Sequence, residues 1–278
     1  MPSVARDQSG VALLMAMLVV AIASVTAVAL VQEQSFSVRK TYNLERFSTA
    51  LTYAMGLEDF ARLYLQLDAR ESKIDSLDEN WALGLPPLPI EGGMLTGAVI
   101  DAQSRINLND LPENEALQEQ FRRLSLKLEL EPVFLPAIID WIDQNIEAEI
   151  PDGAEDDYYS TLEQPYRAAN RRMADVSELR LVKGIDAKIF WALEPYLVAL
   201  PQSVPQNLNT MPVEVFDALG LEVDAGGFSE TREENPFESI DDFSSRMNIV
   251  LDEKQKEYLA VASTYFLVSG GVTIGEQS

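Results

Sequence analysis

The pattern of apolar residues changes once along the first quarter of the chain. From Val11 to Val31 every residue is apolar or small apart from two hydroxyl side chains, and about 20 such residues cross a bilayer as a helix. From Leu44 to Leu67 apolar residues recur every three or four positions, which predicts an amphipathic helix with one buried face. No Pro or Gly intervenes between Val11 and Gly56. The pattern therefore predicts one helix over 11–67, roughly 85 Å long, with residues 11–31 in the membrane.

The start of the chain differs from an ordinary secretory signal. Such a signal has a shorter apolar stretch, of about 7–15 residues, and then a small-x-small cleavage site. Here Val31 is followed by Gln-Glu-Gln, and a lone Gly10 stands directly before the apolar run. These residues leave an uncleaved membrane anchor open and do not explain the glycine.

Short strands and then helices are expected after the long helix. A Pro- and Gly-rich connector, "GLPPLPIEGG", precedes "GMLTGAVIDAQSRINLNDLP", which predicts two short strands around a turn at Asp101–Ser104. From Glu113 onward the apolar spacing is helical, and Ser177 is expected to cap one short helix. The segment "TYFLVSGGVTIG" predicts a closing strand.

A sequence motif occurs twice, one hundred residues apart. "INLNDLP" begins at Ile106 and "QNLNTMP" begins at Gln206, and each precedes a helical pattern. An Asn side chain ahead of a helix accepts hydrogen bonds from the first-turn amides, so two unrelated caps are one explanation. A duplicated helical unit explains the echo better.

These patterns together predict an α+β fold in which a large all-α block is inserted into a small antiparallel sheet. The block would consist of two helix-hairpin units similar to SAM domains. The predicted ranges are 11–67 for the long helix, 68–106 for strands and connector, 107–204 for the first helical unit, 205–262 for the second, and 263–278 for the C-terminal strand, with residues 1–10 ahead of the long helix.

Composition excludes several classes of function. The chain has no His and no Cys, which removes thiolate chemistry, zinc-thiolate sites and every His-containing triad. Its formal net charge of -24 repels phosphate backbones, so no nucleic-acid partner is expected. An enzyme would have to use two carboxylates facing a groove, and no such pair is legible. We therefore expect no enzymatic activity, with a membrane-anchored two-carboxylate hydrolase as the alternative.

One segment concentrates the negative charge. Between Leu128 and Tyr166 eleven residues are acidic and none is Lys or Arg. Clustered carboxylates repel one another and normally stay solvated, but calcium accepts six to eight oxygen ligands and would offset the repulsion. A solvated loop, a calcium site for one or two ions and a catalytic pair are all compatible with this composition. The available oxygen donors are Asp140, Asp143, Asn145, Asp152, Glu155, Asp156 and Asp157.

The short leader ending at Gly10, followed by a membrane-length helix that becomes amphipathic, resembles a type IV pilin-like prepilin. The blocks "DWIDQN", "PDGAEDDYY", "SELRLVKGI", "NLNTMPVEVFDAL" and "YFLVSGGV" are similar, in order, to the K-type minor pseudopilin of type II secretion. The resemblance implies a pilin-like fold, cleavage after Gly10 by a prepilin peptidase, and methylation of Val11. Most pilin-like proteins have Glu where this chain has Met15, and its absence is typical of the K-type.

The resemblance also implies a location, partners and a metal. The protein would be a single-pass inner-membrane protein with a periplasmic C-terminal domain, served by the inner-membrane secretion platform. It would cap the tip of the pseudopilus with I- and J-type minor pseudopilins and initiate its assembly. A minor pilin of a type IV pilus is the alternative. Further strand sequence is expected after Ile274. The helical insert would bind calcium, with ligands at Asp143, Glu155 and Asp156, then Asp140, Asn145 and Asp157.

Overall fold

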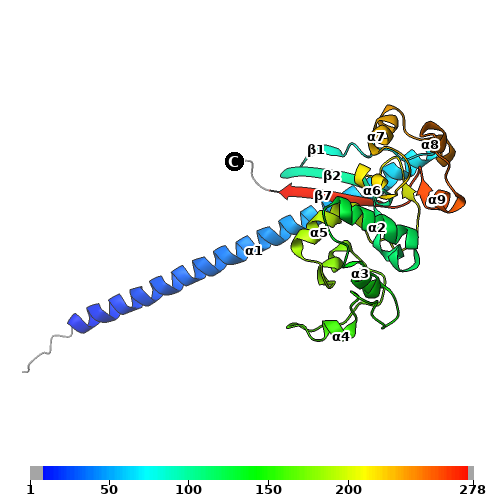
Figure 1. Cartoon of the computed structure of the whole chain (residues 1–278). Coiled ribbons are helices and arrows are strands. Elements are labelled where there is room, and N and C mark those ends of the chain that lie inside the picture. Colours follow the sequence, from blue (N-terminus) through cyan, green and yellow to red (C-terminus); the bar gives the residue numbers. More distant parts are fainter. Residues whose placement is uncertain (1–8, 275–278) are drawn as a thin grey trace, which may run out of the picture. The chain divides into compact units, whose positions relative to one another are not determined.

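The computed structural model describes residues 9–274. Helix α1, Ser9–Glu71, is a single helix of 63 residues (Figure 1). It continues four residues beyond the predicted end at Leu67, because Asp68–Glu71 contains no Pro or Gly to stop it. Its apolar part has a mean hydropathy of 2.7 and is exposed within the monomer, as expected of a helix in lipid. The predicted leader lies outside the described residues except for its last two positions.

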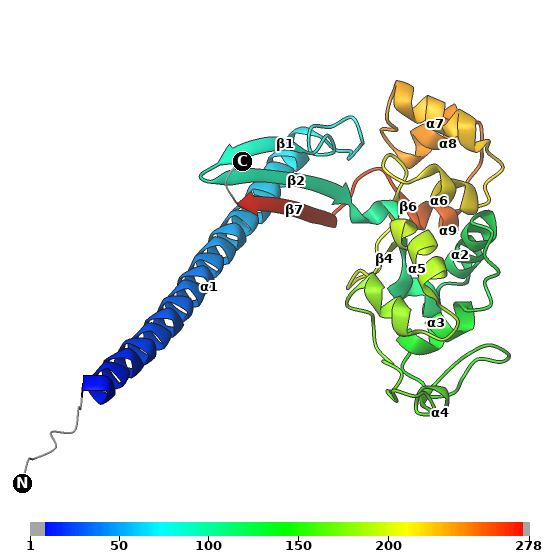
Figure 2. The ribbon, with the colours of Figure 1, turned by 90° about the vertical axis from the view of Figure 1, so that its left-hand side faces the viewer.

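Three strands form the sheet (Figure 2). They are β1, Leu85–Ile90; β2, Gly93–Asp101; and β7, Phe266–Ile274, in the order β1-β2-β7 and with neighbours antiparallel. The strand β1 corrects the prediction of a connector at this point. Its three prolines have no N–H for a ladder, but β1 is an edge strand, where Pro is tolerated. Gly92 turns the chain between β1 and β2 with a φ of 76°, a conformation that favours glycine.

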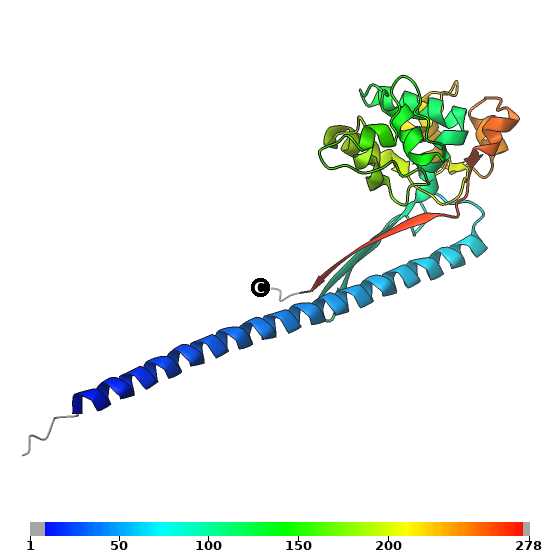
Figure 3. The ribbon, with the colours of Figure 1, turned by 90° about the horizontal axis from the view of Figure 1, so that it is seen from below.

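The chain divides into two compact units. One holds α1 up to Glu58, residues 87–96 and the chain from Gly271. The other holds residues 59–86 and 97–270, including all the short helices (Figure 3). Those elements are η1 Ala102–Ser104, β3 Ile106–Asn107, η2 Leu108–Glu113, α2 Glu115–Lys127, α3 Leu135–Ile142, α4 Asp156–Tyr159, η3 Val176–Leu181, α5 Ala187–Leu193, η4 Glu194–Tyr196, β4 Leu197–Val198, β5 Gln206–Asn207, α6 Val213–Ala218, α7 Ala225–Glu234, α8 Ile240–Arg246, α9 Glu253–Glu257 and β6 Leu259–Ala260.

The cap predicted at Ser177 is wrong. Asp175 caps this segment instead, with its carboxylate accepting a hydrogen bond from the Ser177 N–H at 2.9 Å. The segment itself is the 3-10 helix η3 rather than an α-helix. Aspartate stands two residues earlier and offers a charged acceptor to the first-turn amides, which makes it a strong cap.

Each Asn-Leu-Asn motif starts a helical unit at a two-residue parallel bridge. In the first unit β3 pairs with β4, matching Ile106 with Leu197. In the second unit β5 pairs with β6, matching Gln206 with Leu259. The first strand of each pair opens its unit and the second closes it. The repeat in the sequence is therefore a repeat in the fold.

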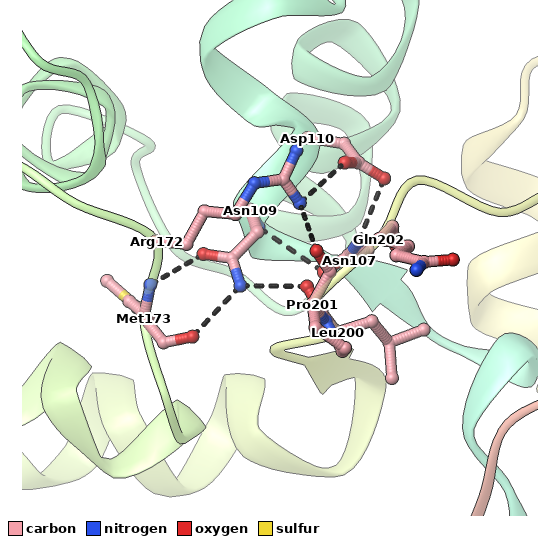
Figure 4. A network of polar contacts seen from close by, with 8 residues as sticks. All are labelled: Asn107, Asn109, Asp110, Arg172, Met173, Leu200, Pro201 and Gln202. Carbon is pink, nitrogen blue, oxygen red and sulfur yellow. Dashed lines mark hydrogen bonds and ion pairs between the residues drawn. The ribbon is translucent and has the colours of Figure 1, made fainter.

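The second Asn of each motif makes the same hydrogen bonds. Asn109 accepts from the Met173 N–H at 2.7 Å and donates to the carbonyls of Met173 and Leu200, both at 3.0 Å (Figure 4). Asn209 accepts from the Phe237 N–H at 2.8 Å and donates to the Phe237 carbonyl at 2.9 Å. Chance similarity of two caps would not reproduce these long-range bonds. The prediction of a duplicated unit is confirmed.

A single hydrophobic core runs through both helical units. The Leu of each motif, Leu108 and Leu208, is completely buried in it. The second unit adds a cluster of stacked and edge-on rings around Phe228. This shared core includes Trp141, Ile142, Ala154 and Tyr159, which anchor the acidic segment of the first unit.

Candidate metal centre

Asp140 fixes the acidic loop that follows α3. Its carboxylate is fully buried and accepts hydrogen bonds from the Glu149 N–H, at 3.1 Å, and from the Ala154 N–H, at 2.7 Å. Burial raises the pKa of Asp140, and these two bonds together with the Lys183 ammonium oppose that rise. The Lys183 ammonium also donates to the carbonyls of Asp152 and Gly153. Asp140 thus closes the loop between residues 140 and 154.

Asp143 and Asn145 form the first bend of this loop. The Asp143 carboxylate accepts from the Asn145 N–H at 3.1 Å and from its side-chain amide at 2.8 Å. The Asn145 side-chain oxygen accepts from the Glu147 N–H at 2.7 Å. Burial and then the nearby Asp140 raise the pKa of Asp143. The bend exposes Asn145 but keeps Asp143 half-buried beside the other acids.

Glu155 is the most unusual group in the loop. It is 5% exposed, and neither of its carboxylate oxygens has a hydrogen-bond partner among the described residues. Burial is the main cause that raises its pKa; the nearby Asn170 side chain opposes the rise, although its geometry falls short of a hydrogen bond, and repulsion from Asp140, Asp143 and Asp156 adds to it. Leaving a buried charged group without a partner is costly. A cation between these carboxylates would remove that cost.

Asp156 and Asp157 differ, although they are adjacent at the start of α4. One Asp156 oxygen accepts from the Ala168 N–H at 3.0 Å, and the other lies 3.7 Å from Arg167 Nε. Asp157 is exposed. The structure therefore places Asp140, Asp143 and Asp156 near enough to Glu155 to repel its charge, with Asn145 at the edge. No three of these carboxylates have oxygens within 4.8 Å of one another; among the described residues only Asp68, Asp75 and Glu79 do. It does not bring Asp157 to them.

Glu149 and Asn170 also belong to this centre, although neither is predicted as a ligand from the sequence. Repulsion from Asp140 and Asp143 adds to burial in raising the pKa of Glu149. The side-chain amide of Asn170 donates to the Asn145 carbonyl at 3.1 Å, while its buried side-chain oxygen has no partner among the described residues. A Cβ on Gly153 would collide with the Asp140 carboxylate, so only glycine fits there. The Asp152-Gly153 pair, by contrast, predicts a turn at this point from the sequence alone.

The oxygen donors fit a hard cation. The centre offers carboxylates and side-chain amides, two unpartnered oxygens on Glu155 and one on Asn170. Calcium prefers such oxygen ligands in irregular geometry, whereas magnesium demands a regular octahedron and keeps several waters. Glu155, Asp143 and Asn170 are the residues that would hold calcium, and the ion would supply charge neutralisation.

The residues predicted for processing lie at the start of α1. Gly10 is helical, and Val11 and Met15 are 60% and 63% exposed. Met15 carries no charge and lies in the apolar stretch 11–31 of this helix.

A membrane helix that becomes amphipathic, a small antiparallel sheet and a duplicated helical insert define a pilin-like subunit. Residues 104–202 match the family described as "Type II secretion system (T2SS), protein K". The chain is 33% identical to type II secretion system protein K of Pseudomonas aeruginosa, over 98% of this chain and 86% of that protein. It is also 33% identical to protein K of Aeromonas hydrophila, over 84% and 76%. The chain belongs to the type II secretion system protein K family.

A solved structure has the same fold. The crystal structure of the GspK-GspI-GspJ complex from enterotoxigenic Escherichia coli matches with a TM-score of 0.77 and 28% identity, over 85% of this chain and 90% of that one. The protein is accordingly a minor pseudopilin of type II secretion, anchored in the inner membrane by one helix with its folded part in the periplasm. The family is a structural component of the secretion machine.

Proposed function

We propose that this subunit caps the tip of the periplasmic pseudopilus and initiates its assembly together with I- and J-type minor pseudopilins. The matching crystal structure is a complex of GspK with GspI and GspJ. The match extends over 90% of the corresponding subunit. This chain therefore has the parts from which an equivalent complex is built.

The observation that carries the tip position is Met15. A carboxylate in an apolar helix bundle is costly unless it pairs with an opposite charge, such as the terminal amine of a neighbouring subunit. With Met at this position the helix offers no partner to the amine of a subunit ahead of it. The subunit therefore fits the tip of the filament, where no other subunit lies ahead of it. Its exposed apolar helix is still able to pack on subunits behind.

The size of the helical insert supports the same position. The two helical units extend from Ile106 to Ala260, more than half of the chain. A helical lattice of compact pilin heads has no room for such an insert at every step. At the end of a filament it meets no such limit.

Deletion of the gene, with complementation, tests the proposal. We expect fewer pseudopili per cell and reduced secretion, with normal elongation of the filaments that do form. Complementation with Met15→Glu should restore initiation without raising the number of copies per filament, because the insert still excludes internal positions. Met17→Glu, two residues away and equally exposed, is the matched control. An unchanged number of filaments with shorter lengths would assign the subunit to elongation instead.

We also propose that a prepilin peptidase cleaves the chain after Gly10 and methylates Val11, and that the inner-membrane platform then takes up the subunit. The support is the glycine directly before the apolar run together with membership of the family.

We further propose that the centre around Glu155 holds calcium, as one or two ions. The support is the pair of buried, unpartnered oxygens on Glu155 beside three further carboxylates. Calorimetric titration of the full chain in detergent should show calcium binding that an equal concentration of magnesium does not reproduce. A titration that shows only the heat of dilution would contradict calcium binding at this centre.

The same geometry disfavours the two-carboxylate hydrolase. Hydrolysis needs two available carboxyl groups on opposite sides of a substrate. Asp140 is committed to the backbone of its own loop, and Asp156 to the Ala168 N–H. We therefore propose a structural role for this centre and not a catalytic one. A minor pilin of a type IV pilus is likewise disfavoured, because the curated relatives are secretion proteins.

A further inference from the structure

A second group of buried acids lies apart from the calcium centre, where four segments of the larger unit meet. Asp75 follows the end of α1, Asp101 ends β2, Asn207 belongs to β5, and Ser263 lies between β6 and β7. Asp75 is 9% exposed, Asp101 is 2% exposed and Asn207 is fully buried. The function of the protein as described above makes no use of these residues.

The two carboxylates are joined through one serine. The Ser263 N–H donates to Asp75 Oδ2 at 2.7 Å, and the Ser263 hydroxyl donates to Asp101 Oδ2 at 2.7 Å. Asn207 adds a second link, since its amide donates to Asp101 Oδ2 at 2.9 Å and to the Asp75 carbonyl at 3.0 Å. The Asp75 N–H donates to the Val261 carbonyl at 2.9 Å. These bonds form a junction between the segment entering β7 and the segment leaving α1.

The Asn-Leu-Asn repeat makes this arrangement specific to the second unit. In the first unit, the amide of Asn107 donates to Asp110 and the side-chain oxygen accepts from the Leu200 N–H, both within that unit. The equivalent Asn207 uses its amide to reach Asp75 and Asp101 instead. The second copy of the motif has thus become part of the junction.

The two acids differ in how well their negative charge is solvated. Asp101 accepts four hydrogen bonds, from the Gln103 N–H and from the side chains of Asn207, Thr210 and Ser263. The Asp75 carboxylate accepts one, from Ser263, among the residues that the structure describes. A buried carboxylate with so few donors is the one that takes up a proton first.

The charged groups that act most strongly on Asp75 are all acidic. Burial is the main cause that raises its pKa, to about 6; the Ser263 N–H opposes the rise, and Glu79, Asp101 and Asp68 add to it. Burial also raises the pKa of Asp101, whose four hydrogen bonds oppose it.

We propose that Asp75 and Asp101, held on Ser263, form a proton-sensitive latch in which uptake of one proton by Asp75 strengthens the attachment of the β7 segment to the end of α1. At neutral pH two buried negative charges share one serine. Protonation removes one of them and with it the repulsion from Glu79, Asp68 and Asp101. Acidification therefore tightens the junction.

The sign follows from linkage. The folded pKa of Asp75 lies near 6, above the ordinary value of 3.8. Between these two values the folded state binds more protons than the unfolded state, so stability rises as pH falls through this range. From about pH 7.5 to about pH 5 this single group should raise the folded-to-unfolded ratio about tenfold. A carboxylate that pairs with a cationic group in the folded state has a lowered pKa, so its contribution to stability is lost as pH falls.

The test compares the full chain in detergent micelles with Asp75→Asn, in chelator-containing buffer, by urea unfolding across this pH range. The variant keeps an acceptor for the Ser263 N–H but cannot titrate. We expect wild type to gain about tenfold in the folded-to-unfolded ratio relative to the variant on acidification. Hydrogen exchange of the peptide containing Ser263 should slow in parallel, beyond its intrinsic pH dependence, in wild type alone. The exposed Glu257→Gln is the control and should titrate like wild type.

A difference between wild type and Asp75→Asn that is constant from about pH 7.5 to about pH 5 would overturn the proposal. Glu79→Gln gives a second test should the first variant fail to fold. Glu79 accepts from the Ser76 N–H and from Trp81 Nε1 with one oxygen, which Gln retains. Removing its charge should move the transition of the Ser263 peptide to lower pH. An unmoved transition would also overturn the latch. Neither result bears on the tip position or on calcium binding.

Discussion

Replacing Glu155 by Gln should reverse the order of stability of wild type and variant when calcium is added. Without calcium the wild-type carboxylate is buried, unpartnered and close to Asp140, Asp143 and Asp156. Its folded pKa is raised above the ordinary 4.5, so at neutral pH the ionised group lowers stability. Gln removes the charge. In chelator the variant should therefore be more stable than wild type by about 1–3 kcal/mol and should melt at a higher temperature.

Calcium should reverse this order because only wild type supplies the full ligand set. At a hundredfold excess over Kd, binding to the native state stabilises by about 2.7 kcal/mol. For a folded part of this size each kcal/mol moves Tm by about 2–4 °C, which gives wild type a rise of roughly 5–11 °C. Glu155→Gln should gain less than half of that rise.

Differential scanning calorimetry of the full chain in detergent, with chelator and with calcium, measures both halves of this prediction. Asp157→Asn is the matched control, since Asp157 is a neighbouring but exposed acid and should respond like wild type. Equal calcium-induced rises in Tm for wild type and Glu155→Gln would show that Glu155 is not a calcium ligand. So would a variant that is less stable than wild type in chelator.

Three other predictions follow from particular residues. Mass spectrometry of the mature protein should find a methylated amine on Val11, and an intact Met1 would contradict processing at the glycine. Asn209→Ala leaves buried backbone groups without partners and should cost about 2–4 kcal/mol in urea unfolding, whereas the exposed Asn80→Ala should be neutral. Gly153→Ala forces a Cβ into the acidic loop, and calorimetry should show calcium affinity reduced at least tenfold.

Patterns with a strong local cause could be predicted from the sequence. The continuous helix follows from apolar spacing that no Pro interrupts and in which Gly56 is the one glycine, and α1 differs from the prediction only at its two ends. The duplicated unit follows from the two Asn-Leu-Asn motifs, because each Asn has a fixed set of partners in its unit. Strand β1 was missed because its prolines mark a connector in isolation, and only its place at the sheet edge permits them.

The candidate centre was predictable in composition but not in geometry. The sequence identifies the acids of the loop, but it does not distinguish Asp140, which binds backbone N–H groups, from Glu155, which has none. Asn170 lies outside the acidic block, and only the folding of the chain brings it to Asn145. The difference between Asp75 and Asp101 likewise depends on donors from distant segments.

The position of the subunit in assembled filaments decides whether it is a tip subunit. A small epitope inserted at Val250, an exposed residue between α8 and α9, marks the helical insert, and immunogold electron microscopy of sheared pseudopili then locates it. A tip subunit gives one cluster of gold at a single end of each filament, in wild type and in Met15→Glu alike. Gold spaced regularly along the filaments would contradict it.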